Sequence, residues 1–167
     1  MPSLAGSFLV ARPALEDSNF RQAVVLLLQH GTEGAFGLVV NRAASVKGLP
    51  FLVYAGGPCE SEGFLMLHGH PDWLDSSPDP GRSEVAPGIY LGDASCLNRI
   101  TEAGSQDALN YRMFAGYAGW GAFQLESELT TGAWAVTPAS GKLLFDTPTE
   151  DLWCRLLPPA IPEPSVN

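Results

Sequence analysis

Short runs of apolar residues, separated by turn-forming residues, give this chain the pattern of a sheet protein. Runs of strand length occur at residues 8–11, 23–28, 36–40, 51–54, 64–67 and 89–91. The stretch from His30 to Gly34 holds two glycines and predicts the turn of a hairpin over residues 23–40. Both strands of that hairpin are apolar at successive positions, so we expect both faces of the sheet to be covered.

Residues 116–136 predict a glycine-rich turn, an amphipathic helix, a glycine stop and a further strand. The helix has an apolar stripe at positions i, i+3 and i+7, which are Ala122, Leu125 and Leu129. Gly132 stands where a left-handed residue commonly ends a helix. No lysine, serine or threonine is placed to hold a phosphate at the glycines, so we interpret them as a structural turn.

A second helix start lies near the C-terminus. Thr147 occupies a capping position, Pro148 the first helical position and Glu150 the third. Leu152 and Leu156 lie four residues apart, on the face that this helix would bury.

Three further segments complete the organisation of the chain. Residues 70–87 carry four prolines and predict a long surface loop, and Asp93 predicts the cap of a short helix through residues 98 to 103. Residues 158–167 hold four more prolines and predict a disordered tail. We therefore predict one α/β (α+β) domain over residues 1–157, with a mixed and largely antiparallel sheet.

Composition and charge predict the cellular compartment and argue against nucleic acid as a direct partner. With 46% hydrophobic and 16% charged residues, the 167-residue chain is typical of a packed globular domain. Its net charge is −9 and its nine basic residues are scattered singly, which argues against direct binding to nucleic acid. No signal peptide and no apolar run of membrane-spanning length are present, so we expect a cytoplasmic protein without a membrane segment. Three distant cysteines without a CxxC pair predict reduced thiols.

Polar residues and glycines that follow the predicted strands are the candidates for ligand binding. Asn41 and Arg42 come directly after a buried strand, where α/β folds commonly bind ligands. Gly56 and Gly57 form a turn in which the backbone is open to a ligand. The remaining candidates stand at the predicted helix start, where unpaired amide groups attract anions, and they are Gly119, Trp120, Gln124 and Glu128. Ordinary turn and core roles explain the same residues more simply.

Two other patterns point only weakly to chemistry. His68, His70 and Asp72 alternate as metal ligands on one face of an extended segment would, but the glycine and proline between them favour a turn. Cys59, beside the glycine turn, suggests a nucleophile activated by a histidine, which would require a lowered thiol pKa. No G-x-S-x-G motif for serine hydrolysis occurs. We therefore assign no catalytic residue, no metal and no cofactor.

Six blocks of sequence, taken in order, resemble the YqgE/AlgH family of small bacterial proteins. They are FLVARPALEDSNF, GAFGLVVNR, YAGGP with a later LH, GIYLGDAS, GYAGWGAFQLESEL and LLFDTPTEDLW, and they cover about residues 4 to 157. Members of this family carry a provisional label of transcriptional regulators, without an established mechanism. The resemblance implies a compact α/β fold with a partly barrel-like sheet flanked by helices, and it implies no catalytic residue.

The chain departs from the family pattern at three places. Phe123 stands where the family usually has glycine before the Gln-Leu pair, and Ala43 stands where proline usually follows Asn-Arg. Only about a dozen residues separate Arg42 from Gly56, where the family typically carries a helix. If that helix contributes to a shared binding surface, this chain lacks it or uses a partner.

The sequence favours a regulatory or binding module that is not an enzyme and that acts through a protein or a small molecule, so any role in transcription is indirect. The alternative is an uncharacterised hydrolase-like enzyme with a pocket near Asn41, Gly57 and Gly119. A third interpretation is an assembly role through an exposed sheet edge. The oligomeric state does not follow from the sequence.

Overall fold

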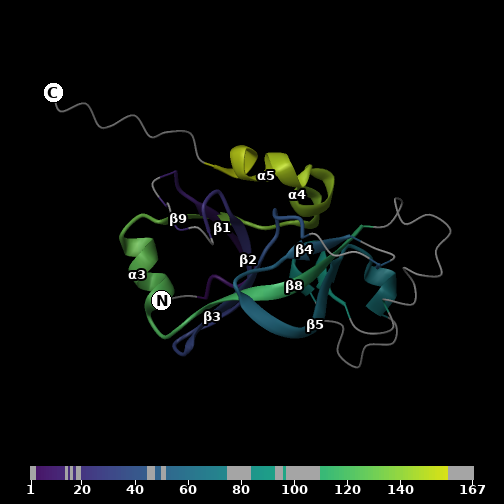
Figure 1. The fold of residues 1–167 in the computed structure, drawn as a ribbon, viewed down its shortest axis with the longest axis horizontal. Helices are drawn as coiled ribbons and strands as arrows, with labels where there is room; N and C mark the ends of the chain where they lie inside the picture. Colours follow the sequence, from purple (N-terminus) through teal and green to yellow (C-terminus); the bar gives the residue numbers. More distant parts are fainter. Residues whose placement is uncertain are drawn as a thin grey trace.

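One curled sheet, half of a barrel, organises this fold (Figure 1). The computed structural model describes residues 3–13, 15, 17, 20–44, 48–49, 52–74, 84–92, 96 and 110–157. The strands within them are β1 (Ser7–Ala11), β2 (Val24–Gly31), β3 (Gly34–Val39), β4 (Val53–Ala55), β5 (Cys59–His68), β6 (Glu84–Ala86), β7 (Ile89–Leu91), β8 (Tyr111–Trp120) and β9 (Trp134–Pro138). Their order is β6-β7-β5-β8-β3-β2-β1-β9, and β4 pairs with β8 beside this path.

The helices lie on different sides of the sheet. Figure 1 shows α4 (Gly141–Asp146) and α5 (Thr149–Leu156) along one side and α3 (Gln124–Thr130) at another end of the molecule, and the short 3-10 helix η1 spans Pro71–Leu74. The pairs in the sheet are antiparallel except for β4 with β8. The predicted α+β fold with a mixed, partly barrel-like sheet is therefore confirmed. No helix in the described part of the chain is long and apolar enough to span a membrane.

Strands β1, β2 and β3 are buried on both faces, as their continuous apolar runs predict. One core contains residues of these strands together with α4 and α5, among them Phe8, Leu26, Leu144 and Leu152. The second core lies on the other face and joins the strands to α3, through Leu9, Val25, Leu27 and Leu125. Fully burying each of these large side chains is worth roughly 1.5–3 kcal/mol, so the two cores hold the sheet between its helices.

Most predicted strands are confirmed, and the hairpin is formed by β2 and β3. Strand β5 begins at Cys59 instead of residue 64, and strand β8 continues through Trp120. The predicted glycine-rich turn at residues 116–121 is therefore wrong, because most of these residues belong to β8. Ala122 is exposed and is not part of the buried face of α3, whereas Leu125 is buried and Gly132 has a φ of 81° as predicted.

The C-terminal helix start is shifted from its predicted place. Helix α4, which the pattern did not predict, ends at Asp146 with Thr147 as its C-cap, and α5 begins after Pro148 without a side-chain cap. Leu152 is nevertheless buried and Leu156 packs beside it, as predicted. The segment 70–87, predicted to be irregular, contains η1 and β6. The helix predicted after Asp93 and the tail 158–167 lie outside the described residues, apart from Cys96.

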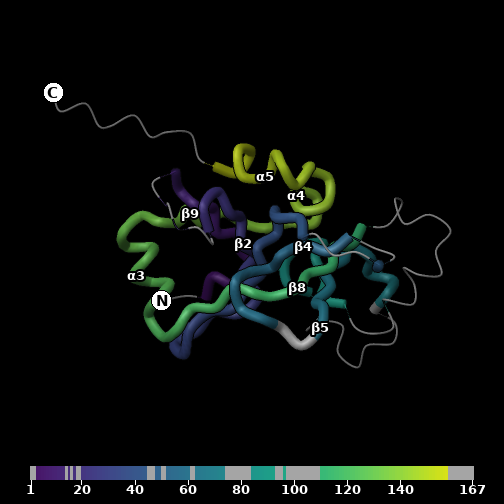
Figure 2. The backbone as a smooth tube through the Cα atoms, viewed as in Figure 1, coloured from purple at the N-terminus to yellow at the C-terminus, as the bar shows by residue number. Residues whose placement is uncertain are grey.

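The link between β4 and β5 crosses over β8, a strand that lies between them (Figure 2). Residues 113–115 of β8 pair with both β4 and β5, so the two strands occupy opposite edges of β8. Only three residues, 56–58, connect them. A Cβ atom on Gly57 would lie 2.2 Å from the carbonyl carbon and oxygen of Tyr117, and one on Gly116 would lie 2.8 Å from the Gly57 oxygen. Glycine is required on both sides of the crossing because the two backbones touch.

We expect Gly57→Ala to destabilise the protein by about 3 kcal/mol or more, because the added methyl overlaps main-chain atoms that cannot move independently of the sheet. The measurement is the free energy of unfolding in urea. The control is Gly31→Ala, since a Cβ there meets no atom within 4 Å and the φ is not positive. Equal stability losses in the two variants would contradict the crossing as the cause.

Candidate binding site at the β2–β3 hairpin

Asn41 and Arg42, the first predicted candidates, anchor the ends of neighbouring strands. The Asn41 side chain accepts a hydrogen bond from the Val24 amide and donates one to the Gln22 carbonyl, both at 2.9 Å. Arg42 donates to the Arg21 carbonyl at 2.6 Å. Burial lowers the pKa of Arg42, and the charge of Asp17 acts in the opposite direction. The two side chains line a cavity of about 280 Å³ next to α5.

Gly56 and Gly57 lie at the crossing over β8, where main-chain atoms fill the space around them. The Gly56 amide donates to the Ala115 carbonyl at 2.8 Å, and the Ala55 amide donates to the Arg42 carbonyl at 2.8 Å. The main chain near Arg42, Gly57 and β8 therefore converges, as the hydrolase-like alternative requires. Asn41 and Gly57 nevertheless line different cavities.

The candidates around α3 form a structural cluster. One carboxylate oxygen of Glu128 accepts from the indole N–H groups of Trp120 at 3.2 Å and Trp134 at 2.9 Å. Both indoles are buried, and Phe20 stacks on Trp120 with ring centroids 5.8 Å apart. Gln124 accepts from the Gly121 amide at 3.0 Å and thereby closes the turn before α3. Gly119 is in β8 rather than in the turn, and Trp120 also lines the cavity described next.

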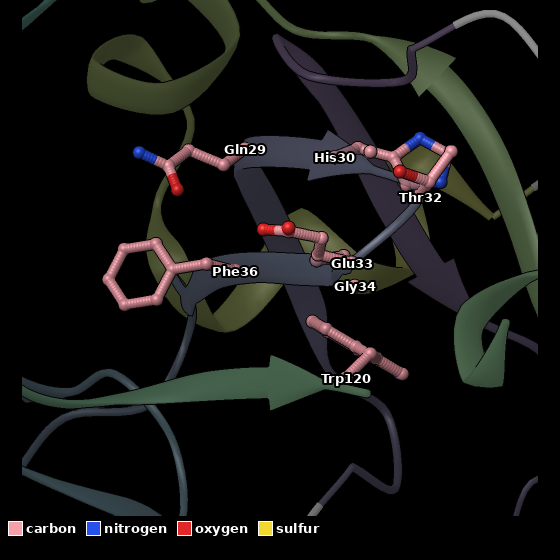
Figure 3. Close-up of a pocket in the computed structure, with 9 residues that line it drawn as sticks. Gln29, His30, Thr32, Glu33, Gly34, Phe36 and Trp120 are labelled. Atoms are coloured by element: carbon pink, nitrogen blue, oxygen red, sulfur yellow. The ribbon is translucent and has the colours of Figure 1, made fainter. Parts of the chain in front are cut away.

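A hollow lined largely by polar and charged residues lies at the end of the β2–β3 hairpin, and we call it the hairpin cavity. It has a volume of about 470 Å³ and is lined by Gln29, His30, Gly31, Thr32, Glu33, Gly34, Ala35, Phe36 and Trp120. Figure 3 shows the Glu33 carboxylate directed toward the space between Gln29 and Phe36, which are cross-strand neighbours. The Phe36 ring is supported by Tyr117, at a centroid distance of 4.9 Å. The cavity therefore offers an aromatic surface beside an amide and a carboxylate.

A smaller hollow, the side cavity, adjoins the hairpin cavity. Its volume is about 180 Å³, and it is lined by Ser3, His30, Gly31, Thr32, Phe123 and Glu126. The two cavities share His30, Gly31 and Thr32, so they adjoin each other at the hairpin tip. None of the described residues that line either cavity is a lysine or an arginine.

His30 joins the hairpin to α3 through both of its ring nitrogens. Its Nδ1 accepts a hydrogen bond from the Leu4 amide at 3.0 Å, so this nitrogen carries no proton. The ring proton of the neutral imidazole is then on Nε2, which donates to Glu126 at 2.5 Å. This hydrogen bond is the main cause that lowers the pKa of Glu126, whose carboxyl group is therefore ionised at neutral pH. With both nitrogens engaged, His30 orients Glu126 and is not placed as a general base.

Phe123 is strained and exposed at the rim of the side cavity. Its φ of 65° is left-handed, a conformation that costs a bulky residue roughly 1–2 kcal/mol. Its side chain is 70% exposed, so packing does not compensate for that cost. The departure from the family's glycine therefore places an apolar ring next to a carboxylate, on a backbone suited to glycine.

His68 and Cys96 are buried and lie next to each other in a second cluster. His68 Nδ1 accepts from the His70 amide at 3.1 Å, and its Nε2 lies 3.9 Å from Cys96 Sγ. His70 Nε2 accepts from the Asn110 amide at 2.9 Å, and burial lowers the pKa of His70. His68 Nδ1 and His70 Nε2 both accept hydrogen bonds from main-chain amides. These bonds hold the main chain next to η1 in place. Within the described residues, no group of three or more His, Cys, Asp and Glu side chains is placed to hold a metal ion.

Sequence reasoning did not identify the hairpin cavity or the side cavity. His30, Thr32 and Glu33 are turn residues by pattern, and Glu126 follows the buried stripe of α3 without belonging to it. The pairing of a hairpin tip with a helix 96 residues away depends on the sheet order, which the pattern does not contain. The one available signal was Phe123, at a position where a glycine is expected.

Comparison with known proteins identifies relatives over almost the whole chain. Residues 8–160 match the AlgH-like family. The UPF0301 protein SCO2948 of Streptomyces coelicolor is 39% identical over 168 residues, covering 93% of this chain and 86% of that protein. The UPF0301 protein CT0663 of Chlorobaculum tepidum is 32% identical over 160 residues, with 90% and 83% covered.

Two solved structures share the fold. The solution structure of the AlgH protein from Pseudomonas aeruginosa is 29% identical, covers 92% of this chain and 86% of its own, and has a TM-score of 0.67. The crystal structure of protein DIP2367 from Corynebacterium diphtheriae is 23% identical, with 98% and 90% covered and a TM-score of 0.73. At 23% identity, the similarity to DIP2367 shows a shared fold alone.

We expect Glu128→Ala to destabilise the protein by about 2–4 kcal/mol, because it leaves two buried indole N–H groups without an acceptor. Glu128→Gln keeps an acceptor oxygen and is expected to lose about 1 kcal/mol. Urea unfolding followed by tryptophan fluorescence measures both. If the two variants are equally stable, the shared acceptor does not hold the cluster together.

The Glu126–His30 hydrogen bond predicts a pH dependence of stability. Because the folded pKa of Glu126 lies below its usual value of 4.5, the bond's contribution is complete above pH 4.5 and is lost as the pH falls through the folded pKa. We expect wild type to be more stable than Glu126→Gln at neutral pH, and the difference to shrink as the pH falls below 4.5 and through the folded pKa. Unfolding curves of both proteins across this range measure the difference. A difference that does not change with pH would be inconsistent with this assignment.

Proposed function

The chain belongs to the AlgH-like family, represented by UPF0301 proteins, and from this premise we propose that it is a cytoplasmic binding module without catalytic activity. In this proposal its working surface is the hairpin face, made of the hairpin cavity and the side cavity. A role in gene regulation, if this member has one, is then exerted through a bound protein or small molecule.

The observation that carries the proposal is the engagement of His30. Hydrolysis usually needs a base with an available lone pair next to a nucleophile or an activated water. On the hairpin face the imidazole accepts from Leu4 and donates to Glu126, so its two nitrogens serve to fix the shape of the surface. The same residues form two hollows with carboxylates and aromatic rings, which suits recognition better than turnover.

Charge supports an indirect route to transcription. The chain carries a net charge of −9, and the described residues lining the hairpin face include Glu33 and Glu126 but no lysine or arginine. Such a surface repels the phosphate backbone of DNA over about 10 Å at 0.1 M salt.

The test fills the hairpin face with a large side chain. Thr32 lines both cavities and lies in the exposed hairpin turn, so Thr32→Trp is expected to block them while the protein stays folded. We expect this variant to fail to restore the protein-abundance profile of a strain that lacks the gene, measured by quantitative mass spectrometry. Lys142→Trp, on the exposed side of α4, is the matched control and should restore it.

Two results would contradict the proposal. Full restoration by Thr32→Trp would show that the hairpin face is not the working surface. Tight binding of the purified wild-type protein to promoter DNA in a low-salt gel shift would show that the indirect route is wrong.

A further inference from the structure

We propose that the hairpin face binds a basic segment of a partner protein, and that the side cavity receives one arginine or lysine side chain of that segment. This inference rests on the proposed function, because it names the class of partner for the same surface. In the bound state the cation pairs with Glu126, and the aliphatic stem of the side chain packs against Phe123.

The size of the side cavity selects a single side chain. Its volume of about 180 Å³ corresponds to about six water molecules and is below the roughly 300–1,000 Å³ of pockets for drug-sized ligands. The side cavity adjoins the larger hairpin cavity, with which it shares the lining residues His30, Gly31 and Thr32. A chain that places one side chain in the side cavity therefore has room to continue across the hairpin cavity.

The charge of the side cavity selects a cation. Glu126 is ionised, because its hydrogen bond to His30 lowers its pKa, while the imidazole that supplies the bond is neutral by its contact with Leu4. The carboxylate thus keeps a full negative charge at the cavity wall. Glu33 provides a second carboxylate in the hairpin cavity, beside the Phe36 ring. A segment with two basic residues therefore finds a carboxylate and an aromatic ring in each hollow, an arrangement that binds guanidinium and ammonium groups.

Phe123 supplies the apolar part of the contact. Arginine and lysine bury their methylene stems along apolar surface while the charged head reaches a polar partner. The ring of Phe123 is 70% exposed and lies on the same cavity wall as Glu126, which gives the stem such a surface. The left-handed backbone holds the ring there without help from the core.

A second copy of this chain does not fit the same requirement. Two molecules with a net charge of −9 repel each other, and the carboxylates of the hairpin face would need a basic patch on the partner copy. The nine basic residues of the chain are scattered singly along the sequence. The charge therefore favours a different protein with a basic segment.

The experiment titrates isotope-labelled protein with a capped six-residue peptide in which arginine alternates with leucine. The comparison peptide has citrulline, which is uncharged and of nearly the same shape, in place of arginine. At low salt we expect the arginine peptide to shift the amide resonances of Thr32 and Phe123, and the citrulline peptide to bind at least about tenfold more weakly. Glu126→Gln should reduce the affinity for the arginine peptide by a similar factor.

Two further variants separate the contact from folding and from net charge. Phe123→Gly should reduce the affinity while the thermal midpoint stays equal or rises, because glycine adopts a φ of 65° without strain. Glu60→Gln removes one exposed carboxylate that lines a different cavity, and it should leave the affinity unchanged. Equal losses in Glu60→Gln and Glu126→Gln would show attraction by net charge alone and would overturn the proposal.

The outcomes also distinguish the two proposals. If neither peptide shifts the hairpin resonances, or if both bind equally, the basic partner is wrong, and the Thr32→Trp result decides separately whether the surface works. If the arginine peptide binds as expected but Thr32→Trp retains full activity in cells, the surface binds cations and the proposed function fails.

Discussion

The close crossing of two backbones at Gly57 and Gly116 is the constraint on which the rest of the structure depends. Strand β8 pairs with β5 along one edge and with β4 and β3 along the other, so it joins the two parts of the sheet. The chain passes from β4 to β5 over this strand within three residues, which leaves no room for a Cβ atom at the contact. The crossing within the half-barrel therefore requires glycine on both backbones, because no other residue fits at this contact.

The hairpin face is a consequence of the same strand. Strand β8 ends at Trp120, and a Cβ atom on Gly34 would lie 2.2 Å from the Trp120 carbonyl oxygen, so the hairpin lies directly against the end of β8. The chain then turns through Phe123 into α3, which places Glu126 within reach of His30. Two elements distant in sequence are thus held together by the main-chain contact of the hairpin with β8 and by the hydrogen bond of His30 with Glu126.

Hydrogen bonding decides what this surface can do. The polar groups that drew attention in the sequence, Asn41, Gln124 and Glu128, are occupied with strand ends, a turn and two indoles. His30 is occupied as well, and it leaves Glu126 ionised and oriented beside an exposed aromatic ring. In our proposal this surface recognises a ligand, and the absence of a lysine or arginine among its described residues favours a cationic one.

By itself, the sequence determined the local features of this protein: the apolar strands buried on both faces, the hairpin, the left-handed Gly132 and the buried leucines of α5. These depend on residue type and on periods of two and 3.6, which short stretches of chain contain. It did not determine that Gly116 belongs to a strand, because the reason for that glycine is the passage of Gly57 over it. The sequence also did not reveal that Glu126 contacts His30, because the distance between these two residues is set by the order of the strands in the sheet. Tertiary structure decided the site, because its residues are neighbours only after the half-barrel has closed around β8.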